Sequence, residues 1–336
     1  MEDFLILSFE QIRSLISMKE CMTLQERAFS AVTSGKALNA PNSFLYLKNE
    51  AGYLKLMSCF LDDAGSKALM VKGIDAFDKN PSKYGIPVVL GFLVLLNPEN
   101  GLPVCLMDGS YITAIRTGAG GGLATRLLAR KDSKSIGVIG TGNTASFTVR
   151  AILESSKGIG KVKVFSRKKE NRESFARQMS PYKVDVEQVE SAREAVRGMD
   201  IVVTGTNSPE PVLLGEWLEP GMHLNVMGIK TEVDWTALQK STVFGDSIEV
   251  ASSDGKASVA IKGGKIPKDH VKSDIGQIVL GLHPGRTSKE EITLFDSSGV
   301  AAQDVVVAAY IYEKAKREGA GSRTRLFDGI EQLMTG

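Results

Sequence analysis

The chain has 336 residues, of which 43% are hydrophobic and 24% charged, as in an ordinary globular protein, and this length predicts two domains or one large one. The net charge of +2 is too small to favour nucleic acid as a partner, and no basic run has the interleaved aromatic residues of a base-stacking platform. The longest apolar stretch, around 88–96, is too short to span a bilayer, so no membrane association is expected.

Neither a sorting signal nor a metal site is expected. The N-terminus, Met1-Glu2-Asp3-Phe4, is acidic rather than basic, unlike a signal peptide, which favours a cytoplasmic location. The three cysteines are scattered, and they indicate packed thiols in a reducing compartment rather than disulfides. The three histidines lack metal-site spacing with acids or cysteines, so a structural metal is not expected.

The N-terminal third reads as mixed α+β. A short strand over 5–9 precedes two helices with apolar residues at helical spacing, and the second of these ends near Ser34-Gly35. Strand-like runs separated by turns follow, as in hairpins, and none of them carries a nucleotide-binding fingerprint. These runs cover residues 43–48, 53–59, 68–73, 88–96 and 102–107.

Residues 110–124 are dense in glycine, alanine, serine and threonine, and helical spacing continues beyond them. Small residues on a helix allow a neighbour or a ligand to approach closely. Arg116 is the exception in this segment. It could be a surface arginine, but its guanidinium fork suits a carboxylate or phosphate, so we favour an anion-binding role.

The segment 135–146 carries the clearest motif. Ile136 to Ile139 is a short apolar run typical of a buried parallel strand, and a helical pattern follows the turn Gly140-Thr141-Gly142. Gly140 permits the tight turn, Gly142 lets the backbone approach a pyrophosphate, and Ala145 lets helix and strand pack closely. The N–H groups at the helix start would face the phosphates. The pattern G-x-G-x-x-A therefore predicts dinucleotide binding.

The second strand of this βαβ unit, Lys161 to Phe165, favours NADP(H) over NAD(H). An acid normally follows this strand and binds the 2′-hydroxyl of the adenosine ribose. Here Ser166 is followed by Arg167, Lys168 and Lys169, which can hydrogen-bond and neutralise a 2′-phosphate. The alternative is that these basic residues form only the solvated start of the next helix.

From Lys134 onward strands and helices alternate, as in a doubly wound parallel sheet. Further strands are expected over 184–186, 201–206, 223–227, 242–246 and 292–295, with helices over 169–179 and 192–197. A final helix over 301–317 is expected to leave this domain and to pack on the N-terminal one.

Several segments together resemble the ornithine cyclodeaminase/μ-crystallin family over nearly the whole chain. They are Arg116-Thr117-Gly118-Ala119 within 108–131, Gly140-Thr141-Gly142, Lys230-Thr231-Glu232, and 295–299 followed by Gln303-Asp304. The resemblance implies an α/β fold in which a Rossmann-type doubly wound parallel sheet, residues 131–305, is inserted in an α+β substrate-binding and dimerisation domain, residues 1–130 plus 306–336. It also implies a homodimer.

The resemblance also implies residue roles. Lys72 matches the family lysine that contacts the substrate carboxylate or carbonyl, and Arg116 matches the arginine at the substrate and the cofactor phosphate. Asn143 and Thr144 fall at the pyrophosphate. Thr206 and Ser297 match cofactor-contacting positions, with Ser297 near the nicotinamide, although helix or turn capping at a strand end is the alternative for both. The expected cofactor-binding residues are Arg116, Thr117, Gly140, Gly142, Asn143, Thr144, Ser166, Arg167, Lys168, Thr206, Met227, Lys230 and Ser297.

One departure bears on the reaction. Ornithine cyclodeaminases carry a Gly-Asp-x-Pro-Gly-Lys-Thr-Glu type segment whose aspartate is the acid/base. The corresponding segment here, 228–232, is shorter and has no aspartate at that place. Cyclodeamination of ornithine is therefore not favoured.

The chemistry implied by the family is hydride transfer between nicotinamide C4 and the α-carbon of an amino or imino acid. Arg116 can hold the carboxylate. Lys72 is the preferred proton-transfer candidate, since burial beside another cation would favour its neutral amine. Glu232 and Asp234 are weaker candidates, and His223 is expected to be structural.

Three hypotheses follow. The first is an NADP(H)-dependent oxidoreductase that reduces an imine, either a cyclic ketimine or a 2-oxo acid plus amine, to a small α-amino or imino acid. The second is a cyclodeaminase-like lyase with tightly held NAD and no net redox change. The third is a non-enzymatic, crystallin-like protein that binds NADPH without turnover.

Overall fold

The computed structural model describes residues 3–47, 52–63 and 66–330, and the chain divides into two compact units. Unit 1 comprises residues 1–17, 34–113 and 301–336, and unit 2 comprises residues 18–33 and 114–300. The sequence predicts limits at 130/131 and 305/306, whereas the two units divide at 113/114 and 300/301. Helix α2 (Met18–Thr33) groups with unit 2, and helix α4 (Gly109–Leu128) runs continuously from one unit into the other.

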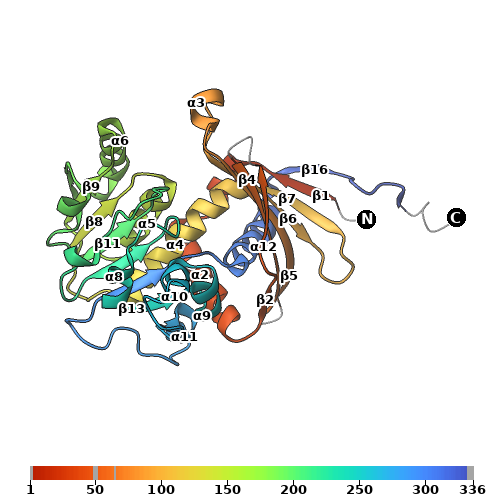
Figure 1. Ribbon diagram of the computed structural model, residues 1–336. Coiled ribbons are helices and arrows are strands. Elements are labelled where there is room, and N and C mark those ends of the chain that lie inside the picture. Colours follow the sequence, from red (N-terminus) through yellow and green to blue (C-terminus); the bar gives the residue numbers. More distant parts are fainter. Residues whose placement is uncertain (1–2, 48–51, 64–65, 331–336) are drawn as a thin grey trace. The chain divides into compact units, whose positions relative to one another are not determined.

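Unit 1 is built on a mostly antiparallel sheet with strand order β16-β1-β7-β6-β5-β4-β2, and β3 pairs with β4 (Figure 1). Residue 48, where the strand expected over 43–48 ends, lies outside the described residues. The helices of this unit are α1 (Phe9–Leu15), α3 (Asn80–Tyr84) and α12 (Ala301–Glu318). The strands are β1 (Phe4–Leu7), β2 (Ala37–Asn39), β3 (Ser43–Leu47), β4 (Gly52–Asp63), β5 (Ser66–Phe77), β6 (Val89–Leu96), β7 (Pro103–Asp108) and β16 (Ser322–Thr324).

One face of this sheet forms the core of unit 1. Directly paired residues share a face, so the register Met57–Lys72–Leu93 defines one row across β4, β5 and β6. All three side chains are buried. Helix α12 packs on β4 and β5, as expected from the sequence, and its buried residues include Asp304 and Val305. A lysine thus lies in the middle of an otherwise apolar layer.

The opposite face of the same sheet is apolar but exposed. The register Ile6–Leu106–Val94–Val71 crosses β1, β7, β6 and β5, and Phe92 lies two residues from Val94 on the same face of β6. Ile6, Val71 and Phe92 are 39%, 38% and 45% exposed. Large apolar residues contiguous on one surface are typical of an interaction site.

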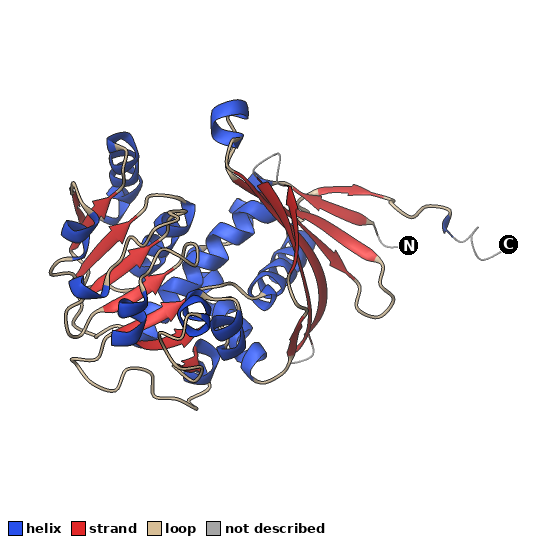
Figure 2. Cartoon of the chain, in the orientation of Figure 1, coloured by secondary structure: helices blue, strands red, loops and turns tan. Residues whose placement is uncertain are grey.

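Unit 2 is built on a parallel sheet with helices around it (Figure 2). Its strand order is β10-β9-β8-β11-β12-β15-β13-β14. The chain moves outward from β8 in one direction and then returns to β11 on its other side, which is the doubly wound arrangement expected from the sequence. The strands are β8 (Ser135–Ile139), β9 (Lys161–Phe165), β10 (Asp185–Gln188), β11 (Ile201–Thr204), β12 (His223–Val226), β13 (Thr242–Gly245), β14 (Val271–Asp274) and β15 (Thr293–Asp296).

Helices connect and cover these strands. The inner strands β8, β11 and β12 are almost wholly buried, as expected for a parallel sheet covered on both faces. Besides α2, the described helices of this unit are α5 (Asn143–Ser155), α6 (Lys169–Met179), α7 (Ala192–Val196), α8 (Trp235–Lys240), α9 (Ile248–Ser253), α10 (Lys256–Lys262) and α11 (Ile275–Val279). In the described part of the chain no helix is both long and apolar enough to cross a membrane.

Candidate functional site

The turn between β8 and α5 has the geometry that its sequence predicts. Gly140 has φ +98°, and a Cβ at this position would lie 2.5 Å from the carbonyl oxygen of Gly205. Glycine is therefore required both for the backbone conformation and for the close approach of the loop after β11. Ala145 is buried against the same Gly205, so strand and helix can pack closely.

The start of α5 fits a dinucleotide phosphate. Gly142 is the N-cap of this helix, it has no side chain to cap the free N–H groups, and a Cβ built on it would have open space around it. Asn143 and Thr144 occupy the first two helical positions. Free N–H groups and the positive end of the helix dipole favour an anion at this point.

Helix α4 lies close against α5 because of its glycines. A Cβ on Gly118 would lie 2.5 Å from the backbone of Phe147, and one on Gly122 would lie 2.5 Å from Ala151. Gly121, between these two glycines, lies close to Met227, which directly follows β12. Arg116 and Thr117 directly precede Gly118 on α4, and the guanidinium of Arg116 lies near Gly299.

Glu232 binds two loops at the carboxyl ends of β11 and β12. Its carboxylate accepts hydrogen bonds from Thr204 Oγ1 at 2.8 Å, from the N–H of Thr206 at 2.9 Å, from Thr206 Oγ1 at 3.2 Å and from the N–H of Gly228. The residue has no exposed surface, and burial raises its pKa. Glu232, a weaker acid/base candidate from the sequence, thus holds the two loops together through hydrogen bonds. One of these bonds comes from the hydroxyl of Thr206, a predicted cofactor contact.

The basic segment after β9 is exposed, and its backbone is held in place by a buried arginine of α6. Arg167 and Lys168 are exposed, whereas Arg172 on α6 is buried and donates to the carbonyl of Ser166 at 2.7 Å. Arg172 also forms an ion pair with Glu190 at 2.8 Å. The turn is therefore anchored while the two basic side chains remain accessible to an anion.

The turn after β15 is surrounded by buried charges. Ser298 donates its N–H to Asp246 at 2.6 Å, and Gly299 donates to the same carboxylate oxygen. Lys256 donates to the carbonyl of Ser297, the expected nicotinamide contact, and lies 3.6 Å from Asp296. Asp246 and Lys256 could not be predicted as partners of this turn, because their only signal is a position near the end of a strand or the start of a short helix.

Lys72 has a different environment from the one expected. Its ammonium nitrogen lies 2.6 Å from a carboxylate oxygen of Asp304, and both side chains are fully buried in unit 1. We expected a neighbouring cation, which would favour the neutral amine; a carboxylate at this distance instead favours the charged ammonium. Lys72 donates a hydrogen bond to Asp304 in this arrangement.

The remaining predicted positions have defined partners. Lys230, an expected cofactor contact, is half exposed and forms an ion pair with Asp254. Asp234 caps α8 by accepting the N–H of Ala237 at 2.8 Å, so it is committed to structure. His223 is fully buried, and burial lowers its pKa to about 3, which agrees with the expected structural role.

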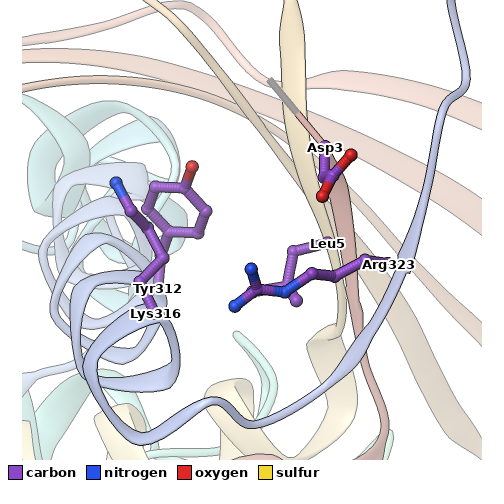
Figure 3. A pocket seen from close by; sticks show the side chains of 5 residues that line it. All are labelled: Asp3, Leu5, Tyr312, Lys316 and Arg323. Atoms are coloured by element: carbon purple, nitrogen blue, oxygen red, sulfur yellow. The ribbon is translucent and has the colours of Figure 1, made fainter. Parts of the chain in front are cut away.

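A small cavity of about 200 Å³ in unit 1 is lined by residues other than those of the predicted site (Figure 3). Tyr312 and Lys316 of α12 lie on one side of it, and Asp3, Leu5 and Arg323 lie on the other. None of the predicted site residues lines it. Among the described residues, no cluster of histidine, cysteine, aspartate and glutamate side chains has a geometry that could hold a metal ion.

Comparisons with known proteins agree with this arrangement. Residues 2–319 match the ornithine cyclodeaminase/mu-crystallin family. Alanine dehydrogenase from Archaeoglobus fulgidus is 39% identical over 96% of this chain and 98% of its own. The structure of Thermococcus litoralis Delta(1)-pyrroline-2-carboxylate reductase in complex with NADH and L-proline aligns with TM-score 0.91 and 37% identity, over 96% of this chain and all of that one. An archaeal alanine dehydrogenase dimer with bound NAD aligns with TM-score 0.90 and 37% identity, over 97% and all of the two chains.

Proposed function

Because the chain belongs to the ornithine cyclodeaminase/mu-crystallin family, we propose that it is a reductase that converts a small α-imino acid to the corresponding α-amino or cyclic imino acid. It is an NAD(P)-dependent oxidoreductase acting on carbon–nitrogen bonds. The imino acid is either a cyclic ketimine or the product of a 2-oxo acid and an amine. The similarity to a pyrroline-2-carboxylate reductase and to an alanine dehydrogenase supports both forms.

We assign the cofactor to the carboxyl edge of the unit 2 sheet. The N–H groups at the start of α5, beside Gly142, would hold the pyrophosphate, and the bound nicotinamide would supply or accept the hydride. NADP(H) is the proposed form, although the two solved relatives hold NADH and NAD. Its support is local, since Arg167 and Lys168 are exposed after β9 and no acid occupies the position of Ser166.

The observation that carries the choice of reductase over lyase is the state of Glu232. It is the carboxylate of the segment 228–232, and its oxygens are taken up by hydrogen bonds from Thr204, Thr206 and Gly228. It cannot reach a substrate without breaking the loops it holds together. The acid/base carboxylate that cyclodeamination requires is therefore not supplied by this segment.

Two cations are proposed to serve the substrate. Arg116 is buried on α4, and its guanidinium can bind a carboxylate through two parallel hydrogen bonds. Lys72, held as an ammonium by Asp304, can orient a carboxylate or donate a proton to the substrate nitrogen. Both roles agree with the negatively charged substrates of this reaction class.

We further propose that two copies of the chain associate through the exposed apolar face of the unit 1 sheet. Ile6, Val71 and Phe92 share this face and are each more than a third exposed. A second copy is the proposed occupant because a solved relative of the same fold is a dimer.

The three cysteines are free and buried, which supports a reducing, cytoplasmic location.

The deciding experiment is a substrate screen that follows the nicotinamide absorbance. NADPH and NADH are each mixed with Delta(1)-pyrroline-2-carboxylate, and separately with pyruvate plus ammonia. Oxidation with at least one pair supports a reductase. Ammonia release from ornithine without any absorbance change would identify a lyase, and tight nucleotide binding without turnover on any substrate would identify a binding protein.

A further inference from the structure

The turn 297–299, which follows β15, is held in place by side chains from outside the turn. Gly299 has φ +81°, and a Cβ there would lie 3.1 Å from the guanidinium of Arg116. The turn therefore packs directly on the arginine proposed to bind anions. Its shape depends on groups outside it, because two of its N–H groups point to a side chain rather than to the backbone.

That side chain is Asp246, which directly follows β13. Strand β13 pairs in parallel with β15, with Gly245 opposite Asp296, so Asp246 and Ser297 start from the same edge of the sheet. One oxygen of Asp246 accepts the N–H groups of Ser298 and Gly299. The other oxygen is buried and has no hydrogen-bond partner among the described residues.

Asp246 lies between two cations. Lys256 of α10 and Arg116 of α4 both act on it electrostatically, and Asp296 is the second carboxylate beside Lys256. Burial nevertheless raises the pKa of Asp246 to about 6, against the lowering effects of the two N–H groups and the two cations. A carboxylate that is buried despite this energetic cost is expected to have a functional role.

We propose that Asp246 is a positioning residue that fixes the turn 297–299 beside Arg116, and thereby sets the nicotinamide end of the dinucleotide site. In a doubly wound sheet a dinucleotide crosses the switch point, which here lies between β8 and β11, so its second half falls toward β12 and β15. The turn after β15 belongs to that second half, whereas Gly142 and Arg167 belong to the first. This inference rests on the proposed cofactor.

The position predicts an effect on one half of the cofactor only. Asp246→Asn retains an oxygen that can accept the two N–H groups but removes the charge between Lys256 and Arg116. We expect the dissociation constant of the intact dinucleotide to rise about tenfold, the effect of exchanging a charged hydrogen-bond acceptor for a neutral one. The affinity for the matching ADP-ribose, which lacks the nicotinamide, should stay unchanged, because its contacts lie on β8, β9 and α5.

The test is isothermal titration of both ligands into wild type, Asp246→Asn and a control, using NADPH with 2′-phospho-ADP-ribose, or NADH with ADP-ribose if the wild type prefers NADH. The control is Asp274→Asn, because Asp274 is also buried, ends the adjacent strand β14 and accepts hydrogen bonds from Gln277 and Thr33. It should lower the melting temperature and leave both affinities unchanged.

Two results for a folded Asp246→Asn variant would overturn the positioning role: equal weakening of both ligands, or an unchanged dinucleotide affinity. If that variant does not fold, Lys256→Met is used instead, because it removes the hydrogen bond to the Ser297 carbonyl. This variant must show the same loss of dinucleotide affinity with unchanged affinity for the ADP-ribose ligand. A wild type that binds ADP-ribose and dinucleotide equally also contradicts the positioning role. A wild type that binds neither contradicts the proposed function itself.

Discussion

The ammonium nitrogen of Lys72 lies 2.6 Å from the carboxylate of Asp304, and neither side chain has exposed surface. The pair joins β5 to the first turn of α12 within an otherwise apolar layer. Taking both charges out of water is costly, so the pair is weak evidence for stability as such. Its value lies in holding a charged donor at a fixed place.

Asp304→Ala should be strongly destabilising. Removing one partner leaves a buried charge without its counter-ion, which costs about 3–5 kcal/mol of unfolding free energy. The matched control is Asp63→Ala, since Lys36 and Asp63 pair at 3.0 Å with the lysine 52% exposed, and its loss should cost no more than about 1 kcal/mol. Urea unfolding measures both values; equal costs would contradict a special role for the buried pair.

Arg167→Asp should reverse the cofactor preference. An aspartate after β9 repels a 2′-phosphate and can accept from a ribose hydroxyl. The dissociation constant for NADPH should therefore rise roughly ten- to a hundredfold, with NADH affinity unchanged or improved. Quenching of tryptophan fluorescence on titration reports both. Arg177→Asp, which makes the same charge change at the far end of α6, should leave the preference intact.

The cofactor turn could be predicted from the sequence, whereas most of its supports could not. Gly140 is recognisable because its positive φ and the close approach of Gly205 demand glycine. Asp304 is separated from Lys72 by 232 residues, and no local pattern relates the two. Strand β14, Val271–Asp274, also went unpredicted because this short edge strand has only one apolar residue.

Val71→Glu should produce a monomer if the exposed sheet face joins two copies. A carboxylate placed in the middle of an apolar interface has no partner, so the dimer dissociation constant should rise roughly a hundredfold or more. Sedimentation velocity at several concentrations measures this. Leu282→Glu, a change at a 71% exposed apolar residue in a loop of unit 2, should leave the assembly unaffected. A monomeric wild type would remove the proposal.

The stability of the protein should fall as the solution becomes acidic, partly through His223. Its pKa is lowered from 6.5 to about 3 by burial and by nearby Arg286, so it stays neutral in the folded protein. Below pH 6.5 the unfolded chain binds a proton that the folded protein does not. Between pH 6.5 and pH 4 this costs about 3 kcal/mol, because each pKa unit corresponds to about 1.4 kcal/mol.

This pH effect has an internal control. Wild type and His223→Gln are unfolded in urea from pH 7 to pH 4, and the variant should show a smaller loss even if it starts less stable. His270→Gln should lose stability as the wild type does, since His270 lies partly exposed beside the carbonyl of Leu238. Identical slopes for wild type and His223→Gln would show that other groups carry the acid sensitivity.

The division of the chain sets the order in which its parts can be completed during synthesis. Unit 1 needs segments that end at residue 113 and others that begin at residue 301, so the ribosome makes all of 114–300 between them. At about 5–20 residues per second, Lys72 waits roughly 10–50 seconds for Asp304 and the rest of α12. During that time β4 and β5 lack the helix α12 that packs on them, and Lys72 lacks Asp304. Unit 1 therefore cannot be expressed as one continuous fragment.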